Sequence, residues 1–193
     1  MIGKRYKIKY KGLTPLVWNR LTKELMDLIK SLKKDELEEN EMKNWLMKAE
    51  VKNGNAIIPP DWIIGNLVNS AKETRIVPSF AVSKSQTFTK YISNIRINPT
   101  EPIVAGKAKD LKRKDAYMSS QGASKMGGKV LRCHPFLEEW GAEFELIDTI
   151  GRMKKDELRT LLDWGGQAVG LGDQRKSNFG RFFVEDLTEV KNA

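Results

Sequence analysis

The segment over residues 4–12 alternates apolar and basic side chains, and this pattern limits the folds that the chain can adopt. In an extended strand the apolar residues fall on one face and the lysines fall on the other. The apolar residues are Tyr6, Ile8 and Tyr10, and the lysines are Lys7, Lys9 and Lys11. The pattern predicts a half-buried strand with a basic outer face, in a sheet that helices cover on one side.

The order of the remaining segments predicts the fold class. Helices are expected over 19–33, 35–50, 61–73 and 154–168, strands within 56–58, 76–104 and 179–187, and a hairpin of two strands over 129–150. We therefore predict a single α+β domain over residues 1–193 with a ferredoxin-like βαββαβ core and an antiparallel sheet. Inserted helices are expected over about 35–73, and a flexible basic arm over about 105–129.

The chain has one cysteine, Cys133, and one histidine, His134. An internal disulfide, a zinc ribbon and an iron–sulfur site each need more of these residues, so all three are excluded. We expect no cofactor and no metal. The N-terminal residues contain no apolar run typical of a signal peptide, and no stretch is long enough to cross a membrane. A cytoplasmic location is the expectation, with no membrane partner.

Charge is the first indication of function. The 193 residues contain 34 Lys and Arg against 25 Asp and Glu, a net charge of +9, which favours a polyanionic partner. The helix over 35–50 is acidic, and its charges are expected on a solvated face. The segment 103–135 holds eight cations against the two aspartates Asp110 and Asp115. The cations are Lys107, Lys109, Lys112, Arg113, Lys114, Lys125, Lys129 and Arg132.

The arm is also rich in glycine and serine and poor in large aliphatic residues. A long, mobile loop or a flexible hairpin has this composition, and a basic one suits contact with nucleic-acid phosphates. A disordered surface loop without a ligand is the alternative.

A glycine-rich run over residues 170–182 lies between the helix over 154–168 and the closing strand. It is not a P-loop or a Rossmann fingerprint, because those motifs require strand, loop and helix in that order. Gly170 and Gly172 would let backbone N–H groups approach an anion. The cations Arg175, Lys176 and Arg181 suit phosphate, and Phe179 could stack on a base. The alternative is a tight connection that uses glycines only for turning.

This run resembles the glycine-rich loop of the RAMP superfamily, the RNA-binding repeat-associated proteins of CRISPR systems. The resemblance is specific over about 154–186 and topological elsewhere. It implies that Gly170, Gly172, Arg175, Lys176 and Arg181 contact an RNA backbone, and that the arm corresponds to the hairpin thumb of backbone subunits. This chain is shorter than many backbone subunits, which leaves a minimal or virus-encoded relative, or a single-stranded DNA-binding protein, open.

Catalysis is the rival class. Processing endoribonucleases of the superfamily often use a histidine, and only His134 is present here. Some backbone subunits cleave RNA through a loop aspartate, a role that Asp110 or Asp115 would have to fill. A structural histidine and solvated aspartates are the simpler interpretations. Of the five tryptophans, Trp140 is the best candidate for a stacking platform or a subunit contact.

We therefore predict that the chain is not an enzyme but a sequence-tolerant protein that binds single-stranded DNA or RNA. The arm and the glycine-rich loop would hold phosphates, and several copies would assemble along the strand. The alternatives are a metal-independent endoribonuclease that uses His134 and a protein-interaction module, such as a viral mimic of a CRISPR subunit.

Overall fold

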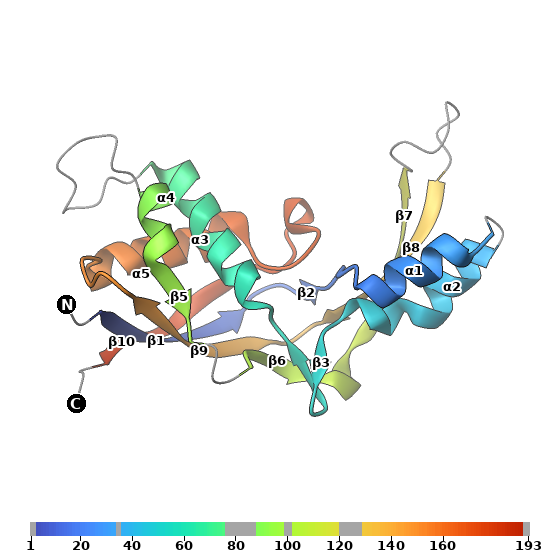
Figure 1. Cartoon of the computed structure of the whole chain (residues 1–193), viewed down its shortest axis with the longest axis horizontal. Coiled ribbons are helices and arrows are strands. Elements are labelled where there is room, and N and C mark those ends of the chain that lie inside the picture. The colour runs from blue at the N-terminus through green and yellow to red at the C-terminus, as the bar shows by residue number, and fades with distance from the viewer. Residues whose placement is uncertain (1–2, 34–35, 76–87, 99–101, 120–128, 191–193) are drawn as a thin grey trace.

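An elongated arrangement of three sheets and several helices makes up the computed structural model (Figure 1). The structure describes residues 3–33, 36–75, 88–98, 102–119 and 129–190. Of residues 117–119, 129 and 130 only the backbone is described, and Lys125 lies outside the described residues. In the described part of the chain, no helix has the length and apolar character needed to cross a membrane.

The main sheet has four antiparallel strands in the order β10-β1-β9-β5. The strands are β1 (Lys4–Gly12), β5 (Ile95–Ile97), β9 (Gly141–Asp148) and β10 (Phe182–Val190). Numbered by their order in the core, they lie in space as 4-1-3-2, so the first strand is central and pairs with the last. This is the order of a ferredoxin-like βαββαβ unit, and it confirms the predicted α+β fold class.

Helices α3 (Pro60–Thr74) and α5 (Lys155–Trp164) cover one face of this sheet (Figure 1). Tyr6, Ile8 and Tyr10 of β1 are buried on that face, as their alternation predicts. Proline at the start of α3 needs no N–H partner there. Helix α3 is the first helix of the core, and so the helical insertion lies before it rather than reaching residue 73. The single-domain assignment stays a prediction.

The outer face of the sheet carries the predicted lysines, but their charge is balanced. Arg5 on β1 forms an ion pair with Glu145 on β9 at 2.7 Å, and Lys9 forms one with Glu185 on β10 at 2.7 Å. Opposite charges on directly facing strands attract across the sheet. The face expected to be basic is therefore mixed in charge, and it gives phosphate no preferred surface.

A second sheet, β2-β8-β7, carries the predicted arm. Its strands are β2 (Leu16–Val17), β7 (Lys112–Ser119) and β8 (Lys129–Leu137). Strands β7 and β8 pair from Lys112↔Phe136 to Ser119↔Lys129, so the arm is a hairpin rather than a loop, and it includes residues up to 137. It projects from the body of the molecule in Figure 1.

The third sheet, β3-β4-β6, contains residues 105–107, the first residues of the predicted arm. Its strands are β3 (Val51–Lys52), β4 (Asn55–Ile57) and β6 (Val104–Lys107), and the turn η4 (Ala108–Asp110) follows. Residues 104–110 therefore anchor the hairpin to the body, and they do not belong to a free arm.

Helix α2 (Leu37–Asn44) and the 3-10 turn η2 (Trp45–Lys48) pack against β8 at the base of the hairpin, and helix α1 (Lys23–Ser31) precedes them in the chain. Thr22 caps α1, because its hydroxyl accepts a hydrogen bond from the Leu25 N–H at 3.2 Å. Lys48 and Glu41 form an ion pair and are only 3% and 4% exposed. The expectation that the charges of this acidic helix are all solvated is therefore wrong for Glu41.

Two predicted strand assignments are wrong. Residues 88–94 form helix α4 (Phe88–Tyr91) and the turn η3 (Ile92–Asn94), and only 95–97 are a strand. The two strands expected to form a hairpin over 129–150 lie in different sheets, because β8 pairs with β7 and β2 while β9 pairs with β1 and β5. Two apolar segments that are neighbours in the sequence can both form strands and yet pair with other strands.

Candidate nucleic-acid interface

The glycine-rich loop begins in a π-helical turn, η5 (Gly165–Val169), at the end of α5, and contains the short turn η6 (Arg175–Ser177). Its glycines face the protein itself. Gly170 and Gly172 have φ values of 78° and 74°, which favour glycine. A Cβ atom on Gly172 would lie 2.5 Å from the Val17 carbonyl oxygen, and one on Gly180 would collide with the Leu171 carbonyl oxygen. The glycines therefore have a reason to be present that requires no ligand.

Asn66, a residue that sequence reasoning missed, holds the start of this loop. Its side-chain amide is buried and donates to the Gly165 carbonyl at 2.9 Å and to the Gly170 carbonyl at 2.8 Å. These two carbonyls mark the two ends of the π-helical turn. The signal in the sequence is an asparagine within the buried stripe of a helix, where a polar group needs a partner.

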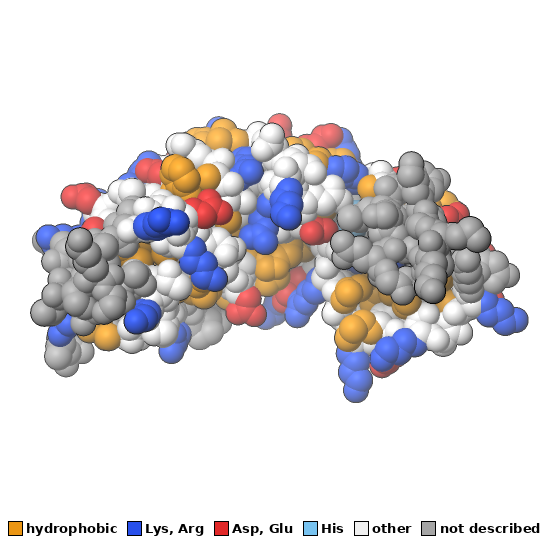
Figure 2. Space-filling view, turned by 90° about the horizontal axis from the view of Figure 1, so that it is seen from above, with side chains coloured by type: hydrophobic (Ala, Val, Ile, Leu, Met, Phe, Trp, Pro, Cys, Tyr) orange, Lys and Arg blue, Asp and Glu red, His pale blue; other side chains and the backbone are white. Residues whose placement is uncertain are grey.

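The loop cations gather beside α3. A cavity of about 220 Å³ is lined by Asn69, Glu73, Ala168, Val169, Arg175, Lys176 and Arg181. Three cations against one carboxylate make this cavity attractive to an anion. Arg181 donates through Nη2 to the Arg175 carbonyl at 3.2 Å, while its buried Nη1 has no hydrogen-bond partner among the described residues. Figure 2 shows Lys and Arg side chains in the middle of this face, between the helical body and the hairpin.

The structure brings the hairpin and the loop together through Lys114. Its ammonium nitrogen lies 3.4 Å from the centroid of the Phe179 ring and donates to Gln174 Oε1 at 2.9 Å. Burial lowers the pKa of Lys114, because a desolvated ammonium is less stable. We call the set Lys114, His134, Asp173, Gln174 and Phe179 the hairpin–loop junction. Two predicted parts of the site, far apart in sequence, are thus in direct contact here.

His134 lies inside this junction and is only 1% exposed. Its Nδ1 is 4.0 Å from Asp173 Oδ2, and among the described residues neither ring nitrogen has a hydrogen-bond partner. Burial and the nearby Lys48 charge lower the pKa of His134, although Asp173 opposes them. This burial fits the structural interpretation of His134, and the absence of catalysis stays a prediction.

Several of the hairpin cations already have partners. Lys112 pairs with Glu138 at 2.5 Å, Arg113 with Asp115 at 2.9 Å and Arg132 with Glu41 at 2.8 Å. Lys107 donates to Asn55 Oδ1 at 3.1 Å, and Lys109 is exposed on η4. For Lys129 the structure describes the backbone only, at the start of β8. The free positive charge of the arm is therefore smaller than the sequence count indicates.

The remaining candidates are not assembled into a site. Asp110 and Asp115 are exposed, and no group of three or more potential metal ligands occurs among the described residues. Trp140 is only 6% exposed, donates to the Thr14 carbonyl at 2.8 Å and packs edge-on against Phe182. The expectation that Trp140 offers a stacking platform or a subunit contact is therefore wrong.

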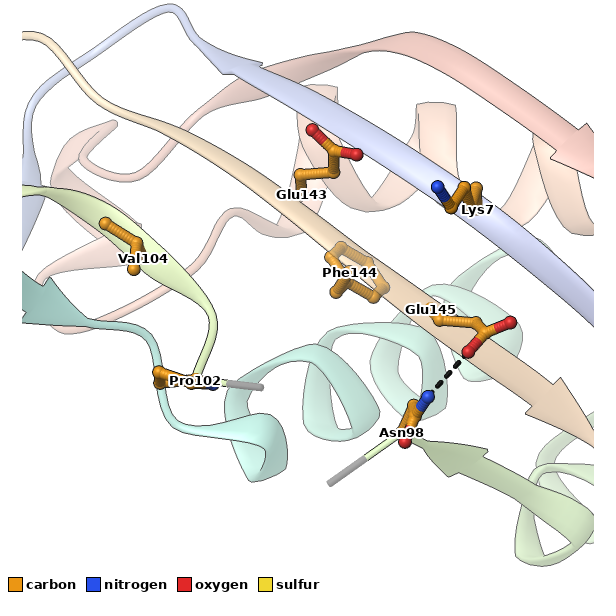
Figure 3. A pocket seen from close by; sticks show the side chains of 7 residues that line it. All are labelled: Lys7, Asn98, Pro102, Val104, Glu143, Phe144 and Glu145. Carbon is orange, nitrogen blue, oxygen red and sulfur yellow. Dashed lines mark hydrogen bonds between the residues drawn. The ribbon is translucent and has the colours of Figure 1, made fainter. Parts of the chain in front are cut away.

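A second cavity, of about 500 Å³, opens beside β1 and β9 (Figure 3). It is lined by Lys7, Asn98, Pro102, Val104, Glu143, Phe144 and Glu145. The Asn98 amide donates to Glu145 at 2.6 Å, and the hydrogen bond from Arg5 lowers the pKa of this carboxyl. Two carboxylates against one ammonium repel phosphate, so this cavity is not part of the candidate interface.

Comparison with known proteins adds evidence on the fold. No family model matches the chain, and no curated protein matches it. Its structure matches a chain in a cryo-EM structure of the Type III-B Cmr-beta bound to cognate target RNA, with a TM-score of 0.54 and 12% sequence identity. The match covers 100% of this chain and 62% of that chain, so this chain spans less than two thirds of its neighbour's length. The likeness supports a RAMP-like fold, and membership of the superfamily stays a prediction.

Proposed function

We propose that this protein binds single-stranded nucleic acid, with RNA preferred, at the surface formed by the glycine-rich loop and the facing side of the hairpin. The loop cations Arg175, Lys176 and Arg181 would hold backbone phosphates. The hairpin cation Lys114 would join them when a strand is bound.

The convergence of hairpin and loop at Lys114 is the observation that carries this proposal. The contact of Lys114 with Phe179 and Gln174 places a hairpin cation beside the loop that holds the other three. A track for a strand needs cations that follow the backbone and an aromatic ring within reach of a base. Phe179 is the half-buried ring that the junction offers.

The preference for RNA is supported by the structural neighbour, which was solved with its target RNA. We extend the proposal to several copies lying side by side along one strand, because one small surface covers only a few nucleotides. Sedimentation of the protein with strands of increasing length tests this point, because the number of bound copies should rise with length.

Salt-dependent binding of labelled oligonucleotides tests the main proposal. We expect a single-stranded RNA to bind more tightly than a duplex, with a steep fall in affinity as salt is raised. The double variant Arg175→Ala, Lys176→Ala should flatten the plot of log K against log salt by about 0.7 for each phosphate contact that is lost. Its melting temperature should stay near that of the wild type, since both side chains are at the surface.

A matched control removes the same two charges elsewhere. Arg152→Ala, Lys155→Ala changes one arginine and one lysine at the opposite end of α5, and both side chains are exposed. Its salt slope should equal that of the wild type. Equal slopes for the two double variants would remove the loop from the interface. No binding to any oligonucleotide at low salt would instead favour the protein-interaction alternative.

A further inference from the structure

In this conformation Lys114 occupies the position over Phe179 that a stacked base would take. The ammonium lies 3.4 Å from the ring centroid, held by the π-system below it and by Gln174 Oε1 at 2.9 Å. A base and an ammonium cannot share that face of the ring. Binding of a base on Phe179 therefore requires Lys114 to leave, and its departure frees both the ring and the Gln174 oxygen.

Unpartnered polar groups lie behind this lysine. Gln174 Nε2 and both ring nitrogens of His134 are buried without a hydrogen-bond partner among the described residues. Lys114 and His134 are directly paired across β7 and β8, so their side chains project from the same face of the hairpin. Buried donors and acceptors without partners are rare and call for an explanation, and a ligand edge is one.

The freed Gln174 amide presents one donor and one acceptor side by side. Adenine offers the complementary pair at its Watson–Crick edge and also at its N6 and N7 edge. Guanine offers two acceptors at the second of these edges, and pyrimidines have a smaller stacking surface. Adenine is thus the base that an amide beside an aromatic ring matches on either edge.

We propose that the hairpin–loop junction is a nucleobase site selective for adenine, covered by Lys114 in the free protein. Phe179 stacks on the base, Gln174 binds its edge, and Lys114 moves to a neighbouring phosphate. This inference rests on the proposed function, and it adds a base preference at one position of an otherwise sequence-tolerant track.

Binding of 12-nucleotide RNA strands of A, C or U at one salt concentration tests the site. The wild type should bind the A strand at least about fivefold more tightly than the other two. Gln174→Asn should abolish this preference, because the amide is drawn back by one methylene. Asparagine tolerates the left-handed backbone at this position, where φ is 55°, so the melting temperature should not change.

Three further variants sharpen the test. Gln167→Asn makes the same change on an exposed side chain of the π-helical turn and should leave the preference intact. Gln174→Ala repeats the loss of preference with no amide present. Lys114→Met should keep the preference for the A strand. It should flatten the plot of log K against log salt by about 0.7, because the displaced ammonium no longer binds a phosphate.

The outcomes separate the base site from the proposed function. Equal affinity of the wild type for the three strands would overturn the base site while strand binding still stood. A preference for A that survives both Gln174 variants would overturn the assignment of Gln174 and the site with it. Failure of all three strands to bind would overturn the proposed function itself.

Discussion

Replacement of Lys48 by methionine should destabilise the protein more than any exposed charge change. Lys48 is 3% exposed and forms an ion pair with Glu41, which is 4% exposed. The same two side chains bind the edge of β8: Glu41 Oε2 accepts from the Cys133 N–H at 3.0 Å, and Lys48 donates to the Cys133 carbonyl at 2.9 Å. The variant would leave a buried carboxylate without its ammonium and a strand carbonyl without its donor.

The size of the expected loss of stability depends on the partners that Glu41 keeps in the variant. Breaking a buried ion pair by removing one partner costs about 3–5 kcal/mol. Arg132 still donates to Glu41 Oε1 at 2.8 Å, so we expect the lower end, about 3 kcal/mol. For a chain of this length each 1 kcal/mol shifts the melting temperature by about 2–4 °C, which gives a fall of about 6–12 °C.

Thermal unfolding followed by circular dichroism measures this fall. Lys43→Met is the matched control, because Lys43 is an exposed lysine on α2, the helix that carries Glu41, and it should change the free energy of unfolding by no more than about 0.5 kcal/mol. The double variant Glu41→Leu, Lys48→Met should cost less than the sum of its single variants, since it leaves no unpaired charge in the interior, and Arg132, which loses Glu41, is 43% exposed. Equal melting temperatures for the Lys48 and Lys43 variants would refute the buried ion pair.

At acid pH the difference in melting temperature between the wild type and Lys48→Met should become smaller. Burial alone would raise the pKa of Glu41, but hydrogen bonds from Lys48, Cys133 and Arg132 hold it below its ordinary value. A depressed pKa contributes stability above the unfolded value of about 4.3, and this contribution is lost as the pH falls through the lower, folded value. The difference in melting temperature should therefore shrink below about pH 4.5, and a constant difference would contradict this account.

Three other predictions concern single residues. Gly172→Ala should lower the melting temperature, because the φ of 74° and the Val17 carbonyl oxygen 2.5 Å from the new Cβ cost about 1–3 kcal/mol. Gly65→Ala is the control: it has open space in α3 and should raise the free energy of unfolding by about 0.5–1 kcal/mol. Equal melting-temperature shifts for the two variants would contradict the close contact at Gly172. Asn66→Leu should lower both the melting temperature and oligonucleotide affinity, measured by unfolding and anisotropy, because the carbonyls of the π-helical turn lose their donor. Burial raises the pKa of Cys133 to about 11, so iodoacetamide should modify it only after unfolding, and rapid labelling of the folded protein in mass spectrometry would show an accessible thiol.

Local patterns in the sequence were sufficient for much of the fold. The alternation over 4–12 predicted which face of β1 is buried, and the glycine and charge content of 105–129 allowed for a hairpin there. The sequence also placed Arg175, Lys176, Phe179 and Arg181 together within one short connection, but it did not indicate that this connection lies against the hairpin. Their role in binding stays a prediction.

The tertiary structure alone decided which strands pair and which charges are free. The runs over 130–133 and 143–147 look like one hairpin in sequence, yet β8 pairs with its nearby neighbour β7, while β9 pairs with β1, which lies more than a hundred residues away in the sequence. Packing of the predicted acidic helix against β8 buries Glu41 and Lys48, and contact between the hairpin and the loop places Lys114 on Phe179. Composition and spacing predicted the kind of element for many segments but not for 88–94, because desolvation and pairing energies arise only when distant segments meet.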